Sequence, residues 1–315
     1  MTPIVGPDRD GLAIHVDQLV KSYGARRVVD DLSFSVAQGE VFALLGRNGA
    51  GKTTTVEMLE GYRTPEAGQV RVLGLDPRRD AAALKQRVGL VLQQGGIYPT
   101  ITAREALRLF ARFYDKPADP EALLAQLGLS TVAGTRYRRL SGGQQRRLAL
   151  AVALVGQPEV LFLDEPTAGM DPQARLLTWE LVRDLKRRGA TVLLTTHLME
   201  EAERLADRIA IIDHGRLVAL GTPQQLLRRG GTETLIRLVV PTELDQAALA
   251  VLPGVESAQA VGRGTYVLET ASPAETAATL TAWLRDRAIV LQELRVGGRS
   301  LEEVFLQLTG RDLRE

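Results

Sequence analysis

The sequence predicts an α/β domain with a mixed β-sheet and an inserted helical subdomain, followed by a small α+β domain. Short apolar runs at 40–45, 160–163 and 191–194 alternate with helix-length segments, a pattern typical of α/β folds. A glycine-rich segment joins the first of these runs to a helix. Beyond residue 231 the expected order becomes β-α-β-β-α-β, which is typical of a ferredoxin-like fold.

The glycine-rich segment has the spacing of a phosphate-binding loop. It reads G-x-x-x-x-G-K-[ST] between an apolar strand and a helix expected at 52–59, the context that such a loop requires. Lys52 would reach the β- and γ-phosphates, and Thr53 would hold Mg²⁺. The flanking strand and helix make a nucleotide-free, Rossmann-like turn the weaker alternative. The loop residues are Gly46, Arg47, Asn48, Gly49, Ala50, Gly51, Lys52, Thr53 and Thr54.

The amino-acid composition excludes several classes of protein. The 315 residues suggest about two domains, and 45% hydrophobic residues are enough for a large core. Lysine and arginine number 39 against 38 acidic residues, whereas a nucleic-acid binder usually has a strong basic excess. We therefore expect no nucleic-acid partner. The chain has no cysteine, which excludes disulfides, zinc–thiolate sites and thiol catalysis.

No membrane-spanning segment or signal peptide is expected from the sequence. The most apolar run, 148–155, is far shorter than the roughly 20 residues that a membrane-spanning helix needs. Residues 1–10 lack the apolar stretch of a signal peptide. If the protein acts at a membrane, another chain must bring it there.

Two residues near expected strand ends could contact a nucleotide. Tyr23 lies in a turn expected between strands at 12–20 and 28–36. Its ring could stack on a purine, although spacing alone favours a surface tyrosine. Gln93 ends a strand expected at 88–92, where its amide could face a metal ion or a water molecule. A simple polar loop is the better-supported alternative for Gln93 without further context.

The segment from about 95 to 157 is predicted to be a helical subdomain, with helices at 102–114 and 120–127. Its last helix begins after a serine N-cap, with a glutamine three residues later as in a capping box. Two glycines between them leave backbone N–H groups open for an anion. An ordinary glycine-rich helix start fits equally well. The residues concerned are Ser141, Gly142, Gly143 and Gln144.

Polar residues follow two further apolar strands. Asp164 and Glu165 come directly after 160–163, and His197 follows the strand that starts at 191. Ligands of α/β proteins bind at this carboxyl edge of the sheet. Asp164 suits metal binding, and Glu165 suits polarising an attacking water; an exposed acidic turn is the weaker alternative. A lone histidine more often satisfies a hydrogen bond than takes part in catalysis, but its position on the same edge favours a role in the site.

In this order the motifs resemble those of the ATP-binding subunit of an ABC transporter. The resemblance spans residues 12–227, and the segments that carry it are Gly46–Thr54, Leu140–Gln144, Val160–Pro172 and Thr195–Glu203. Leu-Ser-Gly-Gly-Gln between a P-loop and an Asp-Glu strand is highly specific. The resemblance implies ATP and Mg²⁺ as cofactors, and hydrolysis of ATP to ADP and phosphate.

The resemblance also implies roles for individual residues. Tyr23 matches the aromatic residue that stacks on adenine, and Gln93 matches the glutamine that senses Mg²⁺ and the attacking water. Asp164 matches the metal-binding acid and Glu165 the catalytic base. His197 matches the histidine that contacts the γ-phosphate.

Two more segments have counterparts in the family. Asp171 lies in the loop that meets the partner cassette, and the segment after Gln93, through Phe113, resembles the region that docks a membrane subunit.

Departures from the family pattern are small. Arg47 stands where proline or serine is frequent, and Gly169–Met170 stands where Gly-Leu is frequent; neither removes a phosphate donor or a metal ligand.

The chain has one P-loop and one Leu-Ser-Gly-Gly-Gln segment. In this family the two meet across a head-to-tail dimer, so the resemblance implies a homodimer, with a heterodimer as the alternative. Ser141 and Gly143 of one copy would cap the γ-phosphate held by Lys52 of the other. The two domains are expected at 12–228 and 232–315, with a hinge at 229–231.

The tail, 300–311, is similar to daunorubicin-resistance-type drug-export ATPases. Those proteins pair with a separately encoded integral membrane permease. The resemblance therefore implies a peripheral subunit on the cytoplasmic face of the cell membrane, powering efflux of a drug-like or hydrophobic compound. One rival is a soluble ABC ATPase of translation or DNA repair, which usually has two cassettes or long coiled coils. A non-hydrolysing regulatory module is another, and Glu165 and His197 argue against it.

Overall fold

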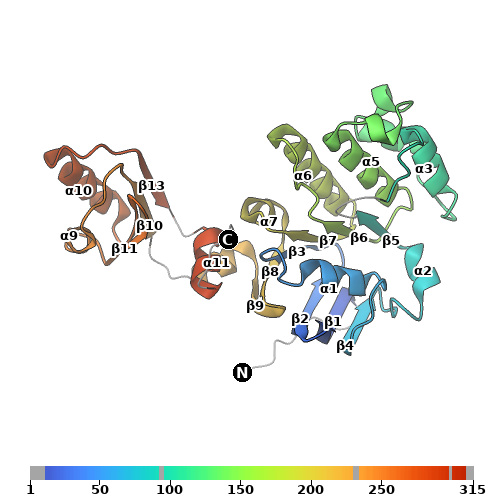
Figure 1. The fold of residues 1–315 in the computed structure, drawn as a ribbon, viewed down its shortest axis with the longest axis horizontal. Coiled ribbons are helices and arrows are strands. Elements are labelled where there is room, and N and C mark those ends of the chain that lie inside the picture. The colour runs from blue at the N-terminus through green and yellow to red at the C-terminus, as the bar shows by residue number, and fades with distance from the viewer. Residues whose placement is uncertain (1–10, 92–95, 230–233, 298–299, 310–315) are drawn as a thin grey trace. The chain divides into compact units, whose positions relative to one another are not determined.

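The computed structural model describes residues 11–91, 96–229, 234–297 and 300–309 (Figure 1). The chain divides into two compact units, one ending at Pro223 and one starting at Gln224. The expected domain bounds, 12–228 and 232–315, stay a prediction. The segment before residue 11, the glycines of the expected hinge and Gln93 lie outside the described residues.

The first unit is built around a six-stranded sheet of order β5-β6-β7-β3-β8-β9. Neighbouring strands are parallel except for β8 and β9, which form an antiparallel hairpin. Every residue of β3, β6 and β7 is buried, which explains why these strands are apolar runs without alternation. The strands are β3 Val41–Leu45, β5 Val88–Val91, β6 Val160–Asp164, β7 Thr191–Thr196, β8 Arg208–Asp213 and β9 Arg216–Gly221.

A second, antiparallel sheet completes the core of the first unit. Its order is β2-β1-β4, with β1 at Leu12–Tyr23, β2 at Arg26–Ala37 and β4 at Ala67–Val72. One hydrophobic cluster joins Phe34 of this sheet, Met58 of helix α1 (Lys52–Leu59) and Phe162 of the main sheet. The helix that follows the glycine-rich loop is therefore anchored on its buried side by both sheets.

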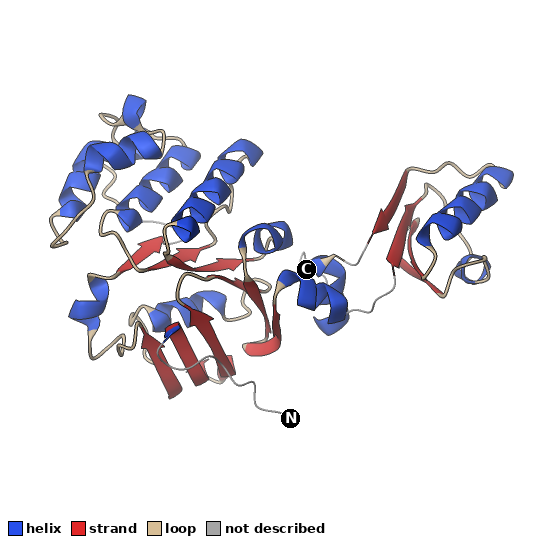
Figure 2. Cartoon of the chain, turned by 180° about the vertical axis from the view of Figure 1, so that it is seen from behind, coloured by secondary structure: helices blue, strands red, loops and turns tan. Residues whose placement is uncertain are grey.

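The predicted helical subdomain forms, and capping side chains define where its helices begin. Thr102 and Glu105 form a capping box at α3 (Ala103–Ala111), and Asp119 caps α4 (Pro120–Gln126). The subdomain closes with α5, Gly142–Leu154. Figure 2 shows these helices on one side of the main sheet and the antiparallel sheet on the other.

One predicted helix is much shorter than expected. The sequence predicts a helix at 78–87, but α2 covers only Ala81–Lys85. The reason is local: Asp76 accepts hydrogen bonds from the backbone N–H groups of Arg78 and Arg79 at 3.0 and 3.2 Å. This turn competes with the first helical turn, as aspartate commonly does.

Two helices pack against the main sheet near its carboxyl edge. They are α6 (Pro172–Arg187), which has the bounds that the sequence predicts, with Pro172 as the first helical residue and the helix continuing through Arg187, and α7 (Met199–Leu205). Asp171 caps α6 by accepting a bond from the backbone of Ala174 at 2.8 Å. Both helices follow strands whose ends carry the predicted site residues.

The second unit contains the predicted β-α-β-β-α-β order. Its four strands are all antiparallel, with order β11-β12-β10-β13, which is the ferredoxin-like arrangement. Helix α9 is shorter than the predicted 242–251 because Asp245 caps it at Ala247. The elements are α8 Pro223–Arg229, which starts at the boundary, β10 Thr234–Val239, α9 Gln246–Ala250, β11 Ser257–Gly262, β12 Thr265–Thr270, α10 Pro273–Asp286, β13 Glu293–Gly297 and α11 Leu301–Thr309.

Candidate active site

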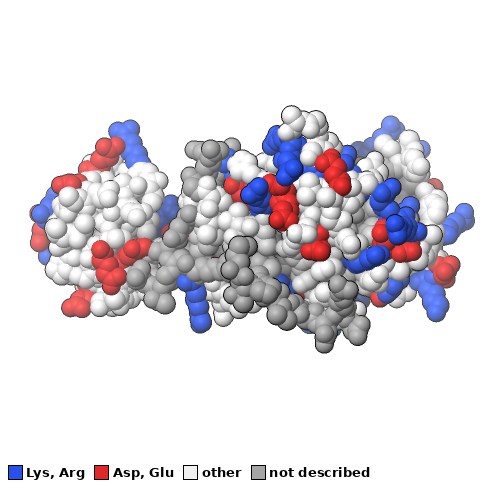
Figure 3. Space-filling model, turned by 90° about the horizontal axis from the view of Figure 1, so that it is seen from below, with Lys and Arg blue, Asp and Glu red and all other residues white. Residues whose placement is uncertain are grey.

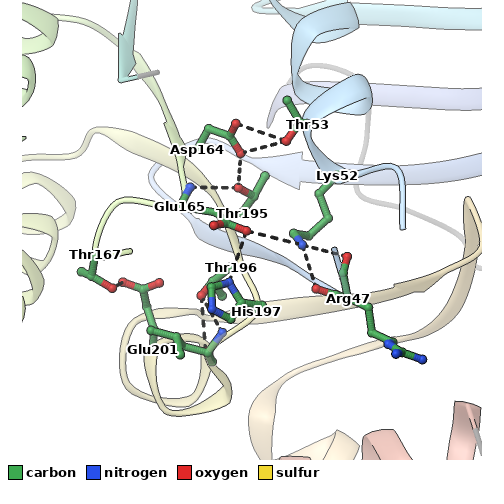
Figure 4. Close-up of polar contacts among 12 residues, drawn as sticks. Arg47, Lys52, Thr53, Asp164, Glu165, Thr167, Thr195, Thr196, His197 and Glu201 are labelled. Atoms are coloured by element: carbon green, nitrogen blue, oxygen red, sulfur yellow. Dashed lines mark hydrogen bonds and ion pairs between the residues drawn. The ribbon is translucent and has the colours of Figure 1, made fainter. Parts of the chain in front are cut away.

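The candidate site lies at the carboxyl edge of the main sheet. Strands β3, β7 and β6 are neighbours, so the loops that leave their ends meet there. These loops carry Lys52, Asp164 with Glu165, and His197 (Figure 4). Segments more than 100 residues apart in sequence thus form one cluster, as Thr53 and Asp164 show by their direct hydrogen bond.

The loop after β3 needs glycine at specific points. Gly51, the N-cap residue of α1, has a φ of 101°, and a Cβ atom there would lie 2.5 Å from the carbonyl oxygen of Val28. A Cβ atom on Gly46 would lie 2.4 Å from the carbonyl oxygen of Ile212. No side chain caps the start of α1. Its backbone N–H groups and the positive end of its dipole are therefore suited to bind an anion.

Lys52 is held inside this loop. Only 5% of the residue is exposed, and its Nζ donates hydrogen bonds to the carbonyl oxygens of Gly46 and Arg47 at 2.7 and 3.1 Å. The Glu165 carboxylate lies 3.7 Å from the same Nζ. Burial lowers the pKa of Lys52, and the carboxylates of Glu165 and Asp164 oppose that change.

Asp164 is oriented by two hydroxyl groups. The Thr53 hydroxyl donates to its Oδ2 at 3.2 Å, and the Thr195 hydroxyl donates to its Oδ1. Within the described residues, no group of three or more histidine, cysteine or acidic side chains could hold a metal by itself. Mg²⁺ is usually bound by one or two carboxylates together with substrate phosphates and water. The oxygen donors of Asp164 and Thr53 fit that kind of shared site.

Glu165 has an unusual backbone and a crowded carboxylate. Its φ is 48°, a conformation that costs free energy for a residue with a Cβ atom and that is often found at active sites. Its backbone N–H donates to the Thr195 hydroxyl at 3.0 Å. Its Oε1 lies 3.2 Å from Nδ1 of His197. One oxygen of Glu165 therefore faces both Lys52 and His197.

Arg146 binds the backbone at the end of strand β6. This residue of α5 is half-buried, and its guanidinium donates to the carbonyl oxygens of Asp164, Glu165 and Pro166. Such an arginine can stabilise the strained turn at Glu165. Burial lowers the pKa of Arg146, against the raising effect of nearby carboxylates.

A cavity of about 310 Å³ opens in front of these groups. It is lined by Val28, Asn48, Gly49, Gly51, Lys52, Thr53, Thr54 and Glu165. Among the described residues, this lining includes none of 141–144. The phosphate-binding loop and the base candidate thus share one cavity, and the Leu-Ser-Gly-Gly-Gln segment does not contribute to it.

The Leu-Ser-Gly-Gly-Gln segment forms the predicted capping box. The Ser141 hydroxyl accepts a bond from the backbone of Gln144 at 3.3 Å, and the Gln144 side chain accepts one from the backbone of Ser141 at 2.9 Å. Ser141 and Gly142 are exposed, and a Cβ atom on Gly142 would meet nothing within 4 Å. This helix start presents backbone to the outside of the chain.

The two remaining predicted site residues are Tyr23, which lies apart from this cluster, and Gln93. Tyr23 ends β1, where the sequence predicts a turn, and is 43% exposed. The guanidinium of Arg63 lies over its ring, 5.3 Å from the centroid, and Nζ of Lys21 lies at 5.8 Å. The ring is accessible, as stacking on a base would require. Gln93 lies outside the described residues.

The sequence reasoning missed several residues of the site. Thr195 and Arg146 hold Asp164 and Glu165, but neither stands out by type or by local spacing. Glu60, the residue after α1, has an Oε1 atom without a hydrogen-bond partner among the described residues. It was absent from the prediction because an acid at a helix end is ordinarily a surface residue.

The geometry defines a P-loop nucleotide hydrolase: an open helix N-terminus, a buried lysine and Glu165 share one cavity, and Asp164 bonds to Thr53 of its lining. A family model described as ABC transporter matches residues 29–168. The chain is 44% identical to the Nod factor export ATP-binding protein I of Paraburkholderia xenovorans, over 96% of this chain and 99% of the relative. It is 39% identical to the daunorubicin resistance ATP-binding protein DrrA3 of Streptomyces coeruleorubidus, over 96% of this chain and 97% of the relative. The chain therefore belongs to the ABC transporter ATP-binding family, and its activity is ATP hydrolysis.

Solved structures agree with this assignment. A structure described as the ATP-binding subunit of an ABC transporter matches with a TM-score of 0.64 and 30% identity, covering 70% of this chain and 93% of that one. The dimeric cassette MJ0796, in a post-hydrolysis state bound to ADP and Pi, matches with a TM-score of 0.62, covering 66% of this chain and 98% of that one. At 22% identity, the second match supports the fold alone.

We expect Glu165→Gln to bind ATP but to hydrolyse it slowly. The amide has nearly the same shape, but it cannot accept the proton of an attacking water, so kcat should fall by about 10²–10⁴-fold. ATP affinity is measured by calorimetry and turnover by phosphate release. Lys52→Ala serves as the comparison and should lose ATP affinity. Turnover of Glu165→Gln at the wild-type rate would rule out the base assignment.

Glu60 gives the first unit a pH-dependent stability. Burial, with Asp164 and Glu57 nearby, raises its pKa from 4.5 to about 8. Between these two values the folded chain keeps a proton that the unfolded chain releases. The free energy of unfolding therefore falls as the pH rises, at a limiting slope of about 1.4 kcal/mol per pH unit.

Glu60→Gln should remove this part of the slope between pH 5 and pH 8. The measurement is urea unfolding in a Trp283→Phe background, followed by the fluorescence of Trp179, which is buried in the first unit. Glu180→Gln, an exposed position on α6, is the control and should leave the slope as in the wild type. Identical slopes for Glu60→Gln and the wild type would contradict the assignment.

Proposed function

We propose that this ATPase powers export of a drug-like or hydrophobic compound through a separately encoded membrane permease. The observation that carries the proposal is the intact cluster of Lys52, Asp164, Glu165 and His197, in a chain similar over nearly its whole length to export ATP-binding proteins. Among the residues described, no helix has the length and apolar character needed to cross a membrane. By analogy with these relatives, another chain would provide the pathway for the cargo, and this subunit would act peripherally on the cytoplasmic face of the cell membrane.

The contacts support a division of labour among the site residues. We assign Lys52, which is buried in the phosphate-binding loop, to the β- and γ-phosphates. Thr53 and Asp164 would hold Mg²⁺, which when bound supplies positive charge against the phosphates. Glu165 would accept the proton of the attacking water. His197, whose Nδ1 lies 3.2 Å from Oε1 of Glu165, would orient that carboxylate and contact the γ-phosphate.

The position of the Leu-Ser-Gly-Gly-Gln segment supports a dimer. Its exposed helix start lies outside the cavity formed by the P-loop of the same chain. A second copy in head-to-tail arrangement would place Ser141 and Gly143 against the nucleotide, and would complete the electrostatic environment of the phosphate only when the two copies close. A homodimer needs no further chain, and a heterodimer with a related cassette is the alternative.

A groove beside the helical subdomain supports docking of a permease. It has a volume of about 850 Å³ and includes Tyr62, Leu90, Ile97, Phe110 and Phe113 in its lining. Tyr62 is 79% exposed and Phe113 is 63% exposed. Exposed aromatic side chains around a groove are typical of protein–protein contact sites. Ile97, Phe110 and Phe113 of this lining belong to the segment that family resemblance assigns to the membrane subunit.

We do not expect this subunit to select the transported compound. The names of two relatives refer to different compounds, Nod factor export in one and daunorubicin resistance in the other, although their identities to this chain are similar, 44% and 39%. Specificity for the cargo is therefore expected in the permease.

On the face drawn in Figure 3, basic and acidic side chains are interspersed, as a net charge of +1 leads one to expect.

The composite site can be tested by mixing two inactive chains. Ser141→Arg blocks the capping segment, and Lys52→Ala disables the P-loop, so each homodimer should be inactive. A mixed dimer keeps one composite site with both parts intact. We expect ATP hydrolysis to reappear on mixing, measured as phosphate release after the subunits have exchanged. Absence of any rescue, with mixed dimers shown to be present, would contradict the head-to-tail arrangement.

The docking groove can be tested by co-expression with a candidate permease, chosen as a polytopic membrane protein whose gene adjoins that of this chain. Phe113→Asp places a charge in the groove and should abolish co-purification with that protein in detergent, because burying an unpaired carboxylate is costly. Val251→Asp makes the same change at an exposed position of the second unit and should have no effect. Full retention of the permease by Phe113→Asp would exclude the groove as the contact.

A further inference from the structure

A buried carboxylate, Glu201, lies behind the candidate active site. Glu201 belongs to α7 and is only 1% exposed. Its Oε1 accepts two hydrogen bonds, one from the Thr167 hydroxyl at 2.8 Å and one from Nε1 of Trp179 at 3.0 Å. Figure 4 shows the contact with Thr167. A carboxylate this deeply buried would be costly without such donors.

The two donors come from different parts of the site. Thr167 is fully buried and follows Glu165 by two positions, in the turn where the backbone N–H of Ala168 bonds to the Glu165 carbonyl at 3.2 Å. Trp179 belongs to α6, which begins at the Asp171 loop. Glu201 itself lies four residues after His197, in the first turn of α7. Three segments are therefore joined at one oxygen atom.

Helix α7 holds the indole of Trp179 from two sides. Glu201 binds its N–H edge, and the guanidinium of Arg204 lies over the ring, 5.4 Å from the centroid. Arg183 of α6 also donates to the carbonyl oxygen of Arg204 at 3.3 Å. The Trp179 side chain is 3% exposed. Helix α7, which follows His197, is therefore in direct contact with this tryptophan.

We propose that Glu201 is a positioning residue that keeps the Glu165 turn and the His197 segment in one fixed arrangement and couples both to α6. It does not reach the nucleotide cavity, whose lining among the described residues does not include it. Its effect on hydrolysis passes through Glu165 and His197, so the proposal rests on the functions proposed above for those two residues. Because α6 begins at the loop assigned to the partner cassette, the same contact links the chemistry to the dimer surface.

The test compares variants that keep or remove the shared acceptor. In Glu201→Gln the amide oxygen can accept both bonds, so kcat should stay within about threefold of the wild type. In Glu201→Leu both donors lose their partner, and kcat should fall at least about tenfold while the Kd for ATP changes less than about twofold. Glu203→Leu makes the same change at an exposed position of α7 and should behave as the wild type. Wild-type kcat in Glu201→Leu would overturn the proposal.

Thr167→Val removes only one donor with little change in shape, and it serves if Glu201→Leu does not fold. It should lower kcat without weakening ATP binding. An equal loss of ATP affinity and kcat would indicate a general structural defect and would overturn the positioning role.

Fluorescence of Trp179 gives a readout independent of turnover. In a Trp283→Phe background it is the single tryptophan of the chain. Addition of ATP with Mg²⁺ should shift its emission, and the shift should be lost in Thr167→Val and kept in Glu201→Gln. An undiminished shift in Thr167→Val would contradict the coupling. If instead Glu165→Gln turned over normally, the proposed base would fail while the fluorescence result still stood.

Discussion

Two adjacent carboxylates at the end of a buried strand, Asp164 and Glu165, impose the main constraint on this structure. Both residues are at most 9% exposed, and charges so buried need partners. Lys52 provides a cation, the Thr53 and Thr195 hydroxyls bind Asp164, and Arg146 satisfies the carbonyl groups of the turn. The strand order places the loops that carry these partners at one edge. The fold can thus be understood as a means of holding two acids beside a phosphate-binding loop.

The proposed catalytic site takes its parts from two copies of the chain. The P-loop and Glu165 share one cavity, whereas the Leu-Ser-Gly-Gly-Gln segment starts a helix that is exposed at Ser141. That helix nevertheless contributes Arg146, which binds the strand end of its own chain. Closure of a dimer on ATP would therefore act on α5. The start of this helix would face the nucleotide of the other copy, and its Arg146 binds the Glu165 turn of its own copy. The aromatic groove lies beside the same helical subdomain, so motion of that subdomain could be transmitted to a permease.

Much of this arrangement could be predicted from the sequence because it depends on local chemistry. The fully buried strands appear as uninterrupted apolar runs, and the capping box at Ser141 and Gln144 follows from their spacing. Errors arose where a local competitor or a distant partner decided the outcome. Asp76 shortened the helix expected at 78–87, and pairing of Tyr23 with Arg26 extended β1 into the expected turn.

Residues that act through distant partners could not be found in the same way. The side chains of Arg146, Thr195 and Glu201 acquire their significance from contacts with segments 18 or more residues away. The sequence shows Glu201 only as one acid in an acidic helix. Burial to 1% exposure and two donors on a single oxygen distinguish it from its neighbours, and only the folded chain supplies that information.

The central claim is that Lys52 and Glu165 of one copy act on an ATP molecule that a second copy completes. A crystal structure of the Glu165→Gln variant with ATP and Mg²⁺ tests it most directly. We predict that Nζ of Lys52 leaves the carbonyl oxygens of Gly46 and Arg47 for the phosphates, with Ser141 of the other copy against the same triphosphate. A nucleotide bound away from Lys52, or capped by Ser141 of its own chain, would contradict the account.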